Sequence, residues 1–236
     1  MKYKRIMLKL SGEALAGDQK QGINPIIVRR FANEIRKVYE CGFEIGIVVG
    51  GGNIWRGIQA EAIGMDRASA DYMGMLGTVI NALALGNTLK EIGVPSRVMT
   101  SMAIPSVAEP YLRNKALSHF AKGRVLVFGG GTGNPYFSTD STASLRAAEM
   151  NADIILMAKN GVDGVYDSDP NTNDSAKRYD ELTYSELINK KLEVIDLTAA
   201  AMCDENNIDM IIFDMNVEGN IKRAAQGENI GTKIRR

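Results

Sequence analysis

The sequence predicts an α/β fold in which helices cover both faces of a mostly parallel sheet. Short, continuous apolar runs alternate with helix-like segments along the chain of 236 residues. Strands that read as continuous apolar runs are typical of parallel sheets buried on both faces. Most of the 24 glycines lie where such runs end, as expected where strands turn sharply into helices.

Composition excludes several classes of protein. The 28 basic and 28 acidic residues balance and the pI is about 6.6, which argues against a nucleic-acid binder held by bulk charge. The apolar run Ile154–Ala158 is typical in length, whereas a membrane span needs roughly 20 residues. No apolar region of the length found in signal peptides follows Met1–Arg5. We therefore expect a cytoplasmic protein without a signal peptide, in which Cys41 and Cys203 stay reduced.

The predicted elements follow one another in a simple order. After a first strand at 5–10, Asn24 caps a helix that has Pro25 at its first position. Further strands are predicted at 44–49, 96–100, 124–128, 153–158, 210–213 and 230–234, and further helices at 66–92, 109–121, 140–150, 183–189 and 198–206. We find no internal repeat and no linker, so we expect one domain over residues 1–236.

Glycine follows the apolar run at three predicted strand ends. These are Gly12, Gly50–Gly52 and Gly129–Gly131. Glycine lets the backbone turn and lets amide groups approach an anion. A single turn of this kind is ordinary, but three at the carboxyl edge of one sheet, where ligands bind, favour a site for several phosphates.

Two common phosphate-binding motifs do not fit. No segment matches a Walker A loop: Gly227 and Gly231 are separated by three residues where the motif has four, and Thr232 stands where lysine is required. A dinucleotide fingerprint needs Gly-x-Gly-x-x-Gly directly after the first strand, and that strand ends in Lys9–Gly12 instead. A nicotinamide-dependent enzyme is therefore a poor second choice, and another phosphate-binding fold is indicated.

Two cations lie beside the first two glycine turns. Lys9 shares a face of the first strand with Met7, opposite Ile6 and Leu8, and Arg56 follows the second turn. An exposed lysine on an edge strand and a surface arginine are the alternative interpretations. Because the carboxyl ends of parallel strands meet at one edge, we expect the two cations to converge.

Five segments have a more specific pattern. They are Leu8–Gly12, Val48–Gly57, Ala70–Leu76, Gly131–Asp140 and Asn160–Pro170. Their strings Asn-Ile-Trp-Arg-Gly, Asp-Tyr-Met-Gly-Met and Thr-Gly-Asn-Pro resemble the bacterial uridylate kinases of the amino-acid kinase superfamily, over essentially the whole chain. The resemblance implies a three-layer α/β/α sandwich and transfer of the γ-phosphoryl group of ATP, with Mg²⁺, to UMP in pyrimidine nucleotide synthesis. It also implies a cytosolic homohexamer that GTP activates and UTP inhibits.

The resemblance also implies roles for individual residues. The catalytic residues would be Lys9, Arg56 and Asp140, with Asp140 orienting the cations. The ATP site would comprise Lys9, Leu10, Ser11, Gly12, Gly52, Arg56, Asn160, Tyr166 and Asp169. The UMP site would comprise Gly51, Asp71, Thr132, Gly133, Asn134, Pro135, Tyr136, Phe137, Ser138 and Thr139. The GTP-responsive loop would be Gly17, Asp18, Gln19, Lys20, Gln21 and Gly22, and no residue is assigned to bind metal directly.

Other interpretations stay open at this point. Asp140 is also well placed to cap the helix that begins there, and Asp71 is also explained as a solvated charge on a helix. A superfamily kinase acting on a carboxylate or carbamate is one alternative function, and a non-catalytic nucleotide sensor is another. A UMP kinase needs no catalytic histidine or cysteine, because the second pKa of a phosphate monoester is roughly 6.

Overall fold

The computed structural model describes residues 2–19, 21–56, 64–170, 172–173, 175–192 and 194–236. Within these residues one nine-stranded sheet has the order β4-β3-β5-β2-β1-β6-β10-β11-β9, and β7 and β8 form a separate pair. Every neighbouring pair in the large sheet is parallel except β10 and β11. The strands are β1 (Arg5–Leu10), β2 (Glu44–Val49), β3 (Ser96–Thr100), β4 (Glu109–Pro110), β5 (Val125–Gly129), β6 (Ile154–Lys159), β7 (Val165–Tyr166), β8 (Arg178–Tyr179), β9 (Glu181–Thr183), β10 (Asp209–Asp214) and β11 (Thr232–Arg235).

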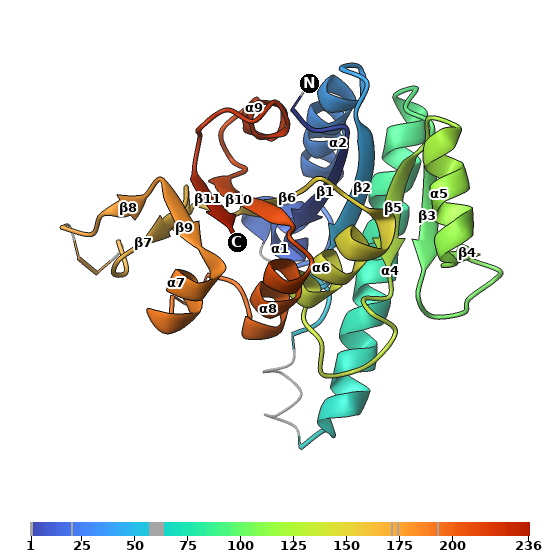
Figure 1. The fold of residues 1–236 in the computed structure, drawn as a ribbon. Helices are drawn as coiled ribbons and strands as arrows, with labels where there is room; N and C mark the ends of the chain where they lie inside the picture. Colours follow the sequence, from blue (N-terminus) through green and yellow to red (C-terminus); the bar gives the residue numbers. More distant parts are fainter. Residues whose placement is uncertain (1, 20, 57–63, 171, 174, 193) are drawn as a thin grey trace.

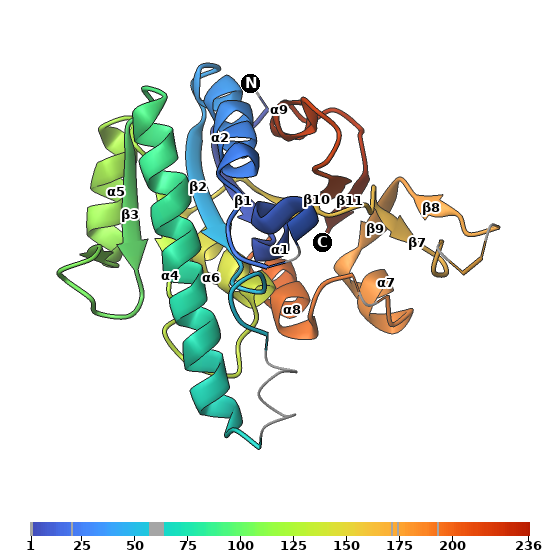
Figure 2. The ribbon, with the colours of Figure 1, turned by 180° about the vertical axis from the view of Figure 1, so that it is seen from behind.

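Helices cover both faces of this sheet, which confirms the predicted three layers. One face packs against α1 (Gly12–Ala16), α2 (Pro25–Tyr39), α4 (Arg67–Glu91) and α9 (Asn220–Ala225). The other packs against α5 (Arg113–Ala121), α6 (Thr139–Met150), α7 (Tyr184–Asn189) and α8 (Leu197–Glu205). Figure 1 shows α6 and α8 in front of the sheet, and Figure 2, from behind, shows α2 and α4.

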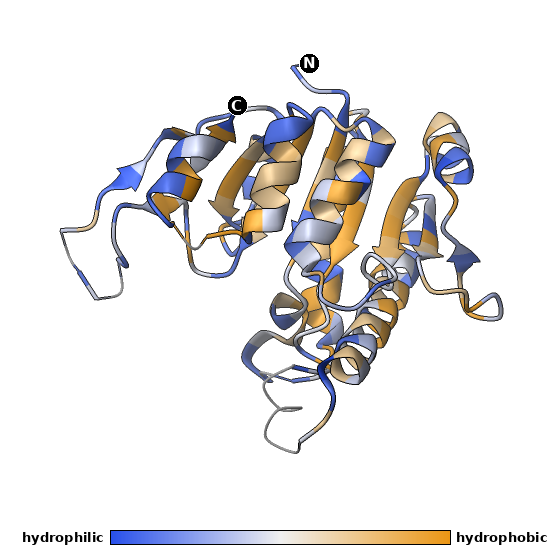
Figure 3. Ribbon diagram, turned by 60° about the horizontal axis from the view of Figure 1, so that its bottom comes forward, coloured by the Kyte–Doolittle hydropathy of each residue, from blue (hydrophilic) through white to orange (hydrophobic). Residues whose placement is uncertain are grey.

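The central strand β1 has the alternation that its sequence predicts. Ile6 and Leu8 belong to the core cluster of one face, and Met7 belongs to the cluster of the other. The strand lies between β2 and β6, so the edge-strand interpretation of Lys9 is wrong. Figure 3 shows the apolar colour concentrated in the strands and on single faces of the helices, as expected for a buried parallel sheet.

Two of the differences from the predicted elements have local causes. The helix expected at 109–121 begins only at Arg113, because Glu109 and Pro110 pair with β3 as β4 and the residue before a proline disfavours helix. The short helix α1 was not predicted, since its five residues are too few for a periodic pattern. In the described part of the chain no helix is long and apolar enough to cross a bilayer.

The contact between α4 and β3 requires a glycine. A Cβ on Gly86 would lie 2.4 Å from Cγ2 of Val98, whereas a Cβ on Gly74 of the same helix would meet nothing within 4 Å. Both Gly→Ala changes gain the same helix propensity, but only Gly86→Ala overpacks the core. We therefore expect Gly86→Ala to be about 1–3 kcal/mol less stable than Gly74→Ala by chemical denaturation. Equal stability of the two variants would show that β3 yields freely.

Candidate active site

The predicted catalytic residues gather at the carboxyl edge of the sheet. In Figure 2 the arrows of β2 and β3 point to the lower edge, where the N-terminal half of α4 extends. Lys9 lies near the end of β1, and its Nζ is 2.9 Å from Oδ1 of Asp140 in the first turn of α6. The Lys9 side chain is only 10% exposed. A lysine so deeply buried is stable in its charged form only beside a partner of opposite charge.

Asp140 does not cap its helix. The N-cap of α6 is Ser138, whose side chain accepts a hydrogen bond from the backbone amide of Ser141 at 3.0 Å. Asp140 is the second residue of the helix, and its carboxylate faces Lys9 instead. The capping interpretation of Asp140 is therefore wrong, and its carboxylate is available to orient a cation.

Sequence reasoning missed a second lysine at the same place. Nζ of Lys159, at the end of β6, lies 3.8 Å from Oδ2 of Asp140. Burial lowers the pKa of Lys159 below its ordinary value; Asp140 partly offsets this, and the charge of Lys9 adds to the lowering. The sequence contained a comparable pattern, because Lys159 ends the apolar run Ile154–Ala158 and Lys9 lies near the end of the first apolar run.

Asp196 joins the starts of two helices beside this pair. It caps α8 by accepting the amide hydrogen of Ala199 at 2.8 Å. Its carboxylate also accepts the hydroxyl hydrogen of Ser141 at 2.9 Å and that of Ser138. The N-termini of α6 and α8 are thereby held together at the edge of the site, which sequence reasoning did not foresee.

The first two glycine turns lie against each other. A Cβ on Gly12 would be 2.5 Å from the carbonyl oxygen of Gly50, so only glycine fits there. The amide of Gly50 donates to the carbonyl of Leu10 at 2.9 Å. The first two strand ends are therefore adjacent, although the predicted convergence concerned Lys9 and Arg56. Ser11 directly precedes α1 in the same turn.

Two buried asparagines hold the second turn. Nδ2 of Asn81, on α4, donates to the carbonyl of Gly50 and to Oδ1 of Asn53, both at 2.7 Å. Nδ2 of Asn53 donates back to Asn81 at 3.1 Å and to the carbonyl of Gly22 at 2.7 Å. The loop at 17–22 is therefore bonded directly to the second glycine turn; its Lys20 lies outside the described residues.

Arg56 takes a different position from the one expected. Its Nη2 lies 2.9 Å from Oε1 of Glu13 on α1, and its Nε donates to the carbonyl of Gly52 at 3.3 Å. The side chain is 51% exposed. Among the described contacts Arg56 and Lys9 share no partner, because Glu13 draws the guanidinium toward α1.

Most residues predicted to bind UMP line one cavity of about 190 Å³. They are Gly51, Asp71, Asn134, Phe137, Ser138 and Thr139, and the same cavity is lined by Trp55, Thr142 and Gly52, which was predicted for the ATP site. The amide of Tyr136 donates to Oδ2 of Asp71 at 2.8 Å, which joins the loop after β5 to α4. Thr132 bonds within that loop, to Asn134, and Gly133 and Pro135 belong to the same turn.

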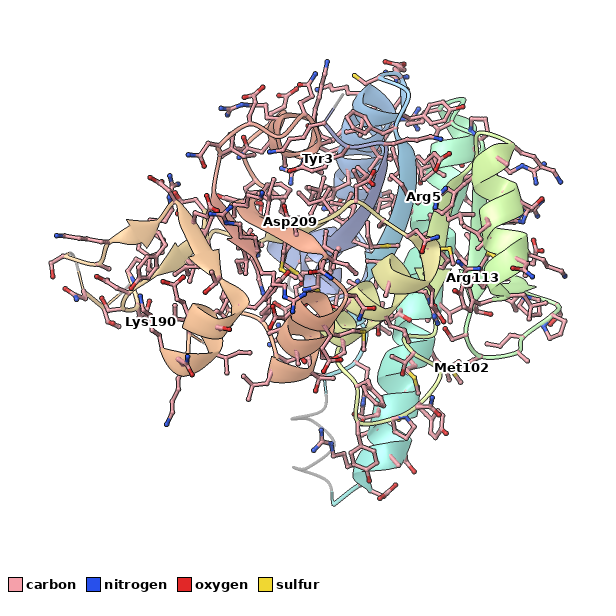
Figure 4. The ribbon with its side chains drawn as sticks, in the orientation of Figure 1. Tyr3, Arg5, Met102, Arg113, Lys190 and Asp209 are labelled. Atoms are coloured by element: carbon pink, nitrogen blue, oxygen red, sulfur yellow. The ribbon has the colours of Figure 1, made fainter. Side chains whose placement is uncertain are left out.

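Two larger cavities lie elsewhere at the surface. One of about 630 Å³ is lined by Tyr166 and Asp169, two of the residues predicted for the ATP site, and by Lys159 and Lys190. Figure 4 places Lys190 just after α7, on the side of the β7–β8 pair. The second, of about 670 Å³, is lined by Asp140, Lys159 and Asp196. Asn160 lies at the carboxyl end of β6, where its Oδ1 accepts from Nδ2 of Asn216 at 2.8 Å.

The residues that could bind a divalent ion are few. Among the described residues no group of three histidine, cysteine, aspartate or glutamate side chains gathers. Magnesium commonly binds through substrate phosphates with one or two carboxylates and water. Asp140 and Asp196, which line one cavity, fit an ion held in that way.

Comparisons with known proteins agree with this geometry. Residues 4–214 match the model of the amino acid kinase family, and the chain belongs to that family. It is 55% identical over 235 residues to the uridylate kinase of Pediococcus pentosaceus, covering 100% of this chain and 98% of that protein.

Solved structures give the same picture. The UMP kinase of Bacillus anthracis superposes with a TM-score of 0.96 at 43% identity, covering 99% of this chain and 96% of that one. The UMP kinase of Ureaplasma parvum superposes with a TM-score of 0.95 at 40% identity, covering 100% of both chains.

The asparagine pair makes a prediction about stability. Asn81→Leu leaves the buried carbonyl of Gly50 and the amide group of Asn53 without their partner, and each such group costs about 1–3 kcal/mol. We expect a loss of about 2–4 kcal/mol in chemical denaturation. Thr88→Val in the same helix, which removes only a bond to the Ala84 carbonyl, should cost less than about 1 kcal/mol. Similar losses in both variants would contradict the role of the pair.

Proposed function

We propose that the protein is a UMP kinase, which transfers the γ-phosphoryl group of ATP to UMP and releases UDP and ADP for pyrimidine nucleotide synthesis. The observation that carries this proposal is the buried Lys9–Asp140 pair. Asp140 lines one of the two larger cavities, and its neighbour Thr139 lines the smaller cavity of Asp71. The names of the relatives support the choice of UMP as the acceptor.

UMP occupies the smaller cavity in this proposal. The Asp71 carboxylate accepts hydrogen bonds from the ribose hydroxyls, and residues 132–139 enclose the phosphate and the base. Gly51 lies where a Cβ would be 2.5 Å from the Gly74 carbonyl, so no side chain fits at this point of the cavity wall. Asp71 already accepts a hydrogen bond from the amide of Tyr136, which would align the carboxylate before UMP binds.

ATP occupies the two larger cavities in this proposal. Lys9, Leu10, Ser11, Gly12, Gly52 and Arg56 hold its phosphates, and Asn160, Tyr166 and Asp169 hold its nucleoside end. The Tyr166 hydroxyl donates to Oδ1 of Asp163 at 2.6 Å, so the ring is held in place at the cavity wall. To reach the phosphates, the Arg56 side chain must either break its ion pair with Glu13 or move together with the Glu13 side chain.

The chemistry then needs charge and position, not a protein base. An oxygen of the UMP phosphate forms a bond to the γ-phosphorus, and the bond to the bridging oxygen breaks as ADP leaves with the electron pair. The acceptor phosphate is already ionised near neutral pH, so no proton is transferred. Lys9 and Arg56 stabilise the negative charge of the transferring group, and Asp140 orients Lys9. Magnesium bound to ATP would neutralise part of the phosphate charge, with Asp140 or Asp196 within reach.

Regulation and assembly are part of the proposal. We propose one kinase domain over residues 1–236, active in the cytoplasm as a homohexamer, with GTP as activator and UTP as inhibitor. The hydrogen bond between Asn53 and Gly22 supports a route from the 17–22 loop to the site. Exposed apolar side chains along α4 support association between copies; they are Tyr72, Met73, Leu76 and Ile80.

A substrate panel tests the function directly. The purified protein is assayed for ADP release with ATP, magnesium and one acceptor at a time: UMP, CMP, carbamate or N-acetylglutamate. We expect turnover with UMP far above the others. Carbamate and N-acetylglutamate lack the ribose that Asp71 would bind, and the names of the relatives favour UMP over CMP. Preference for carbamate or N-acetylglutamate would identify a different superfamily kinase, and nucleotide binding without turnover would identify a sensor.

The Lys9–Asp140 pair makes a second prediction. Asp140→Asn keeps the side-chain size but removes the charge that holds Lys9, so kcat should fall by about 10² or more. Asp209→Asn is the matched control, because Asp209 pairs with Lys233 at 2.7 Å at the opposite end of the strands (Figure 4). It should lose stability but keep kcat near the wild-type value. A folded Asp140→Asn enzyme with normal kcat would remove Asp140 from the mechanism.

A further inference from the structure

Lys159 occupies a defined place relative to Lys9. Strands β1 and β6 are parallel neighbours, and Lys9 is paired in register with Met157. Side chains two residues apart share a face of a strand, so Lys159 lies on the face of Met157 and Lys9. It is about 6.6 Å nearer to the carboxyl edge of the sheet, which is the edge that opens to the cavities.

Asp140 bridges the two lysines unequally. Its Oδ1 is 2.9 Å from Nζ of Lys9, but its Oδ2 is 3.8 Å from Nζ of Lys159, which is beyond hydrogen-bond length. Burial lowers the pKa of the Lys159 ammonium, and among the described residues Asp140 and Asp196 both raise it, but by less. The nearby carboxylate of Asp196 already accepts hydrogen bonds from Ser138, Ser141 and Ala199. An ammonium has three hydrogens to donate, so Lys159 retains donors for a ligand.

Lys159 also lines both large cavities. It is among the residues that border the 630 Å³ cavity and the 670 Å³ cavity, and its side chain is only 23% exposed. Burial lowers its pKa despite Asp140, so the protein without ligand holds a cation that is incompletely compensated. A phosphate anion in either cavity would supply the missing charge.

We propose that Lys159 is a further catalytic residue, whose ammonium binds the phosphates of ATP and stabilises the transferring phosphoryl group together with Lys9. This inference rests on the proposed kinase function. The bonds made and broken are those already described, and Lys159 stays protonated throughout. Asp140 holds one lysine with each carboxylate oxygen, so the two cations reach the phosphates from neighbouring strands.

The competing interpretation is that Lys159 only neutralises Asp140. Replacement would then lower stability without affecting phosphate recognition. Lys233 offers a matched control, because it pairs with Asp209 at 2.7 Å, its side chain is 26% exposed, and it lies on β11 outside the two large cavities. The same substitution at the two lysines separates a lost ion pair from a lost phosphate contact.

The experiment compares Lys159→Gln, Lys159→Arg and Lys233→Gln with the wild type. For each we would measure thermal stability, kcat and KM with ATP and UMP, and the binding of ATP and adenosine by calorimetry. We expect Lys159→Gln to lower kcat by about 10² or more and to reduce the preference for ATP over adenosine by at least tenfold. Lys159→Arg should recover much of both, and Lys233→Gln should change neither.

Each result has a distinct meaning. Wild-type protein without UMP kinase activity would refute the proposed function, and the ATP-to-adenosine preference would still test Lys159. Normal kcat and normal preference in folded Lys159→Gln would overturn the inference. If that variant does not fold, Lys159→Met removes the charge without leaving a polar amide, and the same two readouts decide.

Discussion

The ion pair between Lys9 and Asp140 is the interaction on which the arrangement of the site depends. A lysine in the central strand of a buried sheet is costly unless an opposite charge lies beside it. Asp140 supplies that charge from the first turn of α6 at 2.9 Å, so the start of this helix lies over the end of β1. Because Asp196 hydrogen-bonds to Ser138 and Ser141, the start of α8 is held there too.

The glycine turns impose a second constraint, which is steric. Gly12 and Gly50 approach so closely that neither turn could carry a side chain toward the other. The backbone of both turns then lies at the edge where phosphates are proposed to bind, with the Gly50 amide already bonded to the Leu10 carbonyl. Asn53 and Asn81 stabilise this approach and connect it to Gly22. A change in the 17–22 loop therefore reaches the second glycine turn through the two hydrogen bonds between Gly22 and Asn53.

The charges of the site suit a mechanism that depends on preorganised cations. Lys9 and Lys159 share the carboxylate of Asp140, and burial penalises the charged form of Lys159. This arrangement costs stability in the protein without ligand and favours the binding of an anion. Arg56 is instead half exposed and paired with Glu13, so its charge is less buried than the charges of the two lysines. Preorganised cations of this kind require no proton transfer from the protein.

The sequence by itself determined the class of fold, the alternation of β1 and the glycine strand ends, because apolar periodicity and backbone freedom are local properties. It also indicated Lys9 through its place in an apolar strand. Only the tertiary structure decided that β1 is central, that Asp140 pairs with Lys9 while Ser138 caps the helix, and that Arg56 turns to Glu13. The tertiary structure also places Lys159 beside Asp140. The ion pairs join residues far apart in the chain. The packing of the whole sheet sets which strands are neighbours, and no local pattern encodes it.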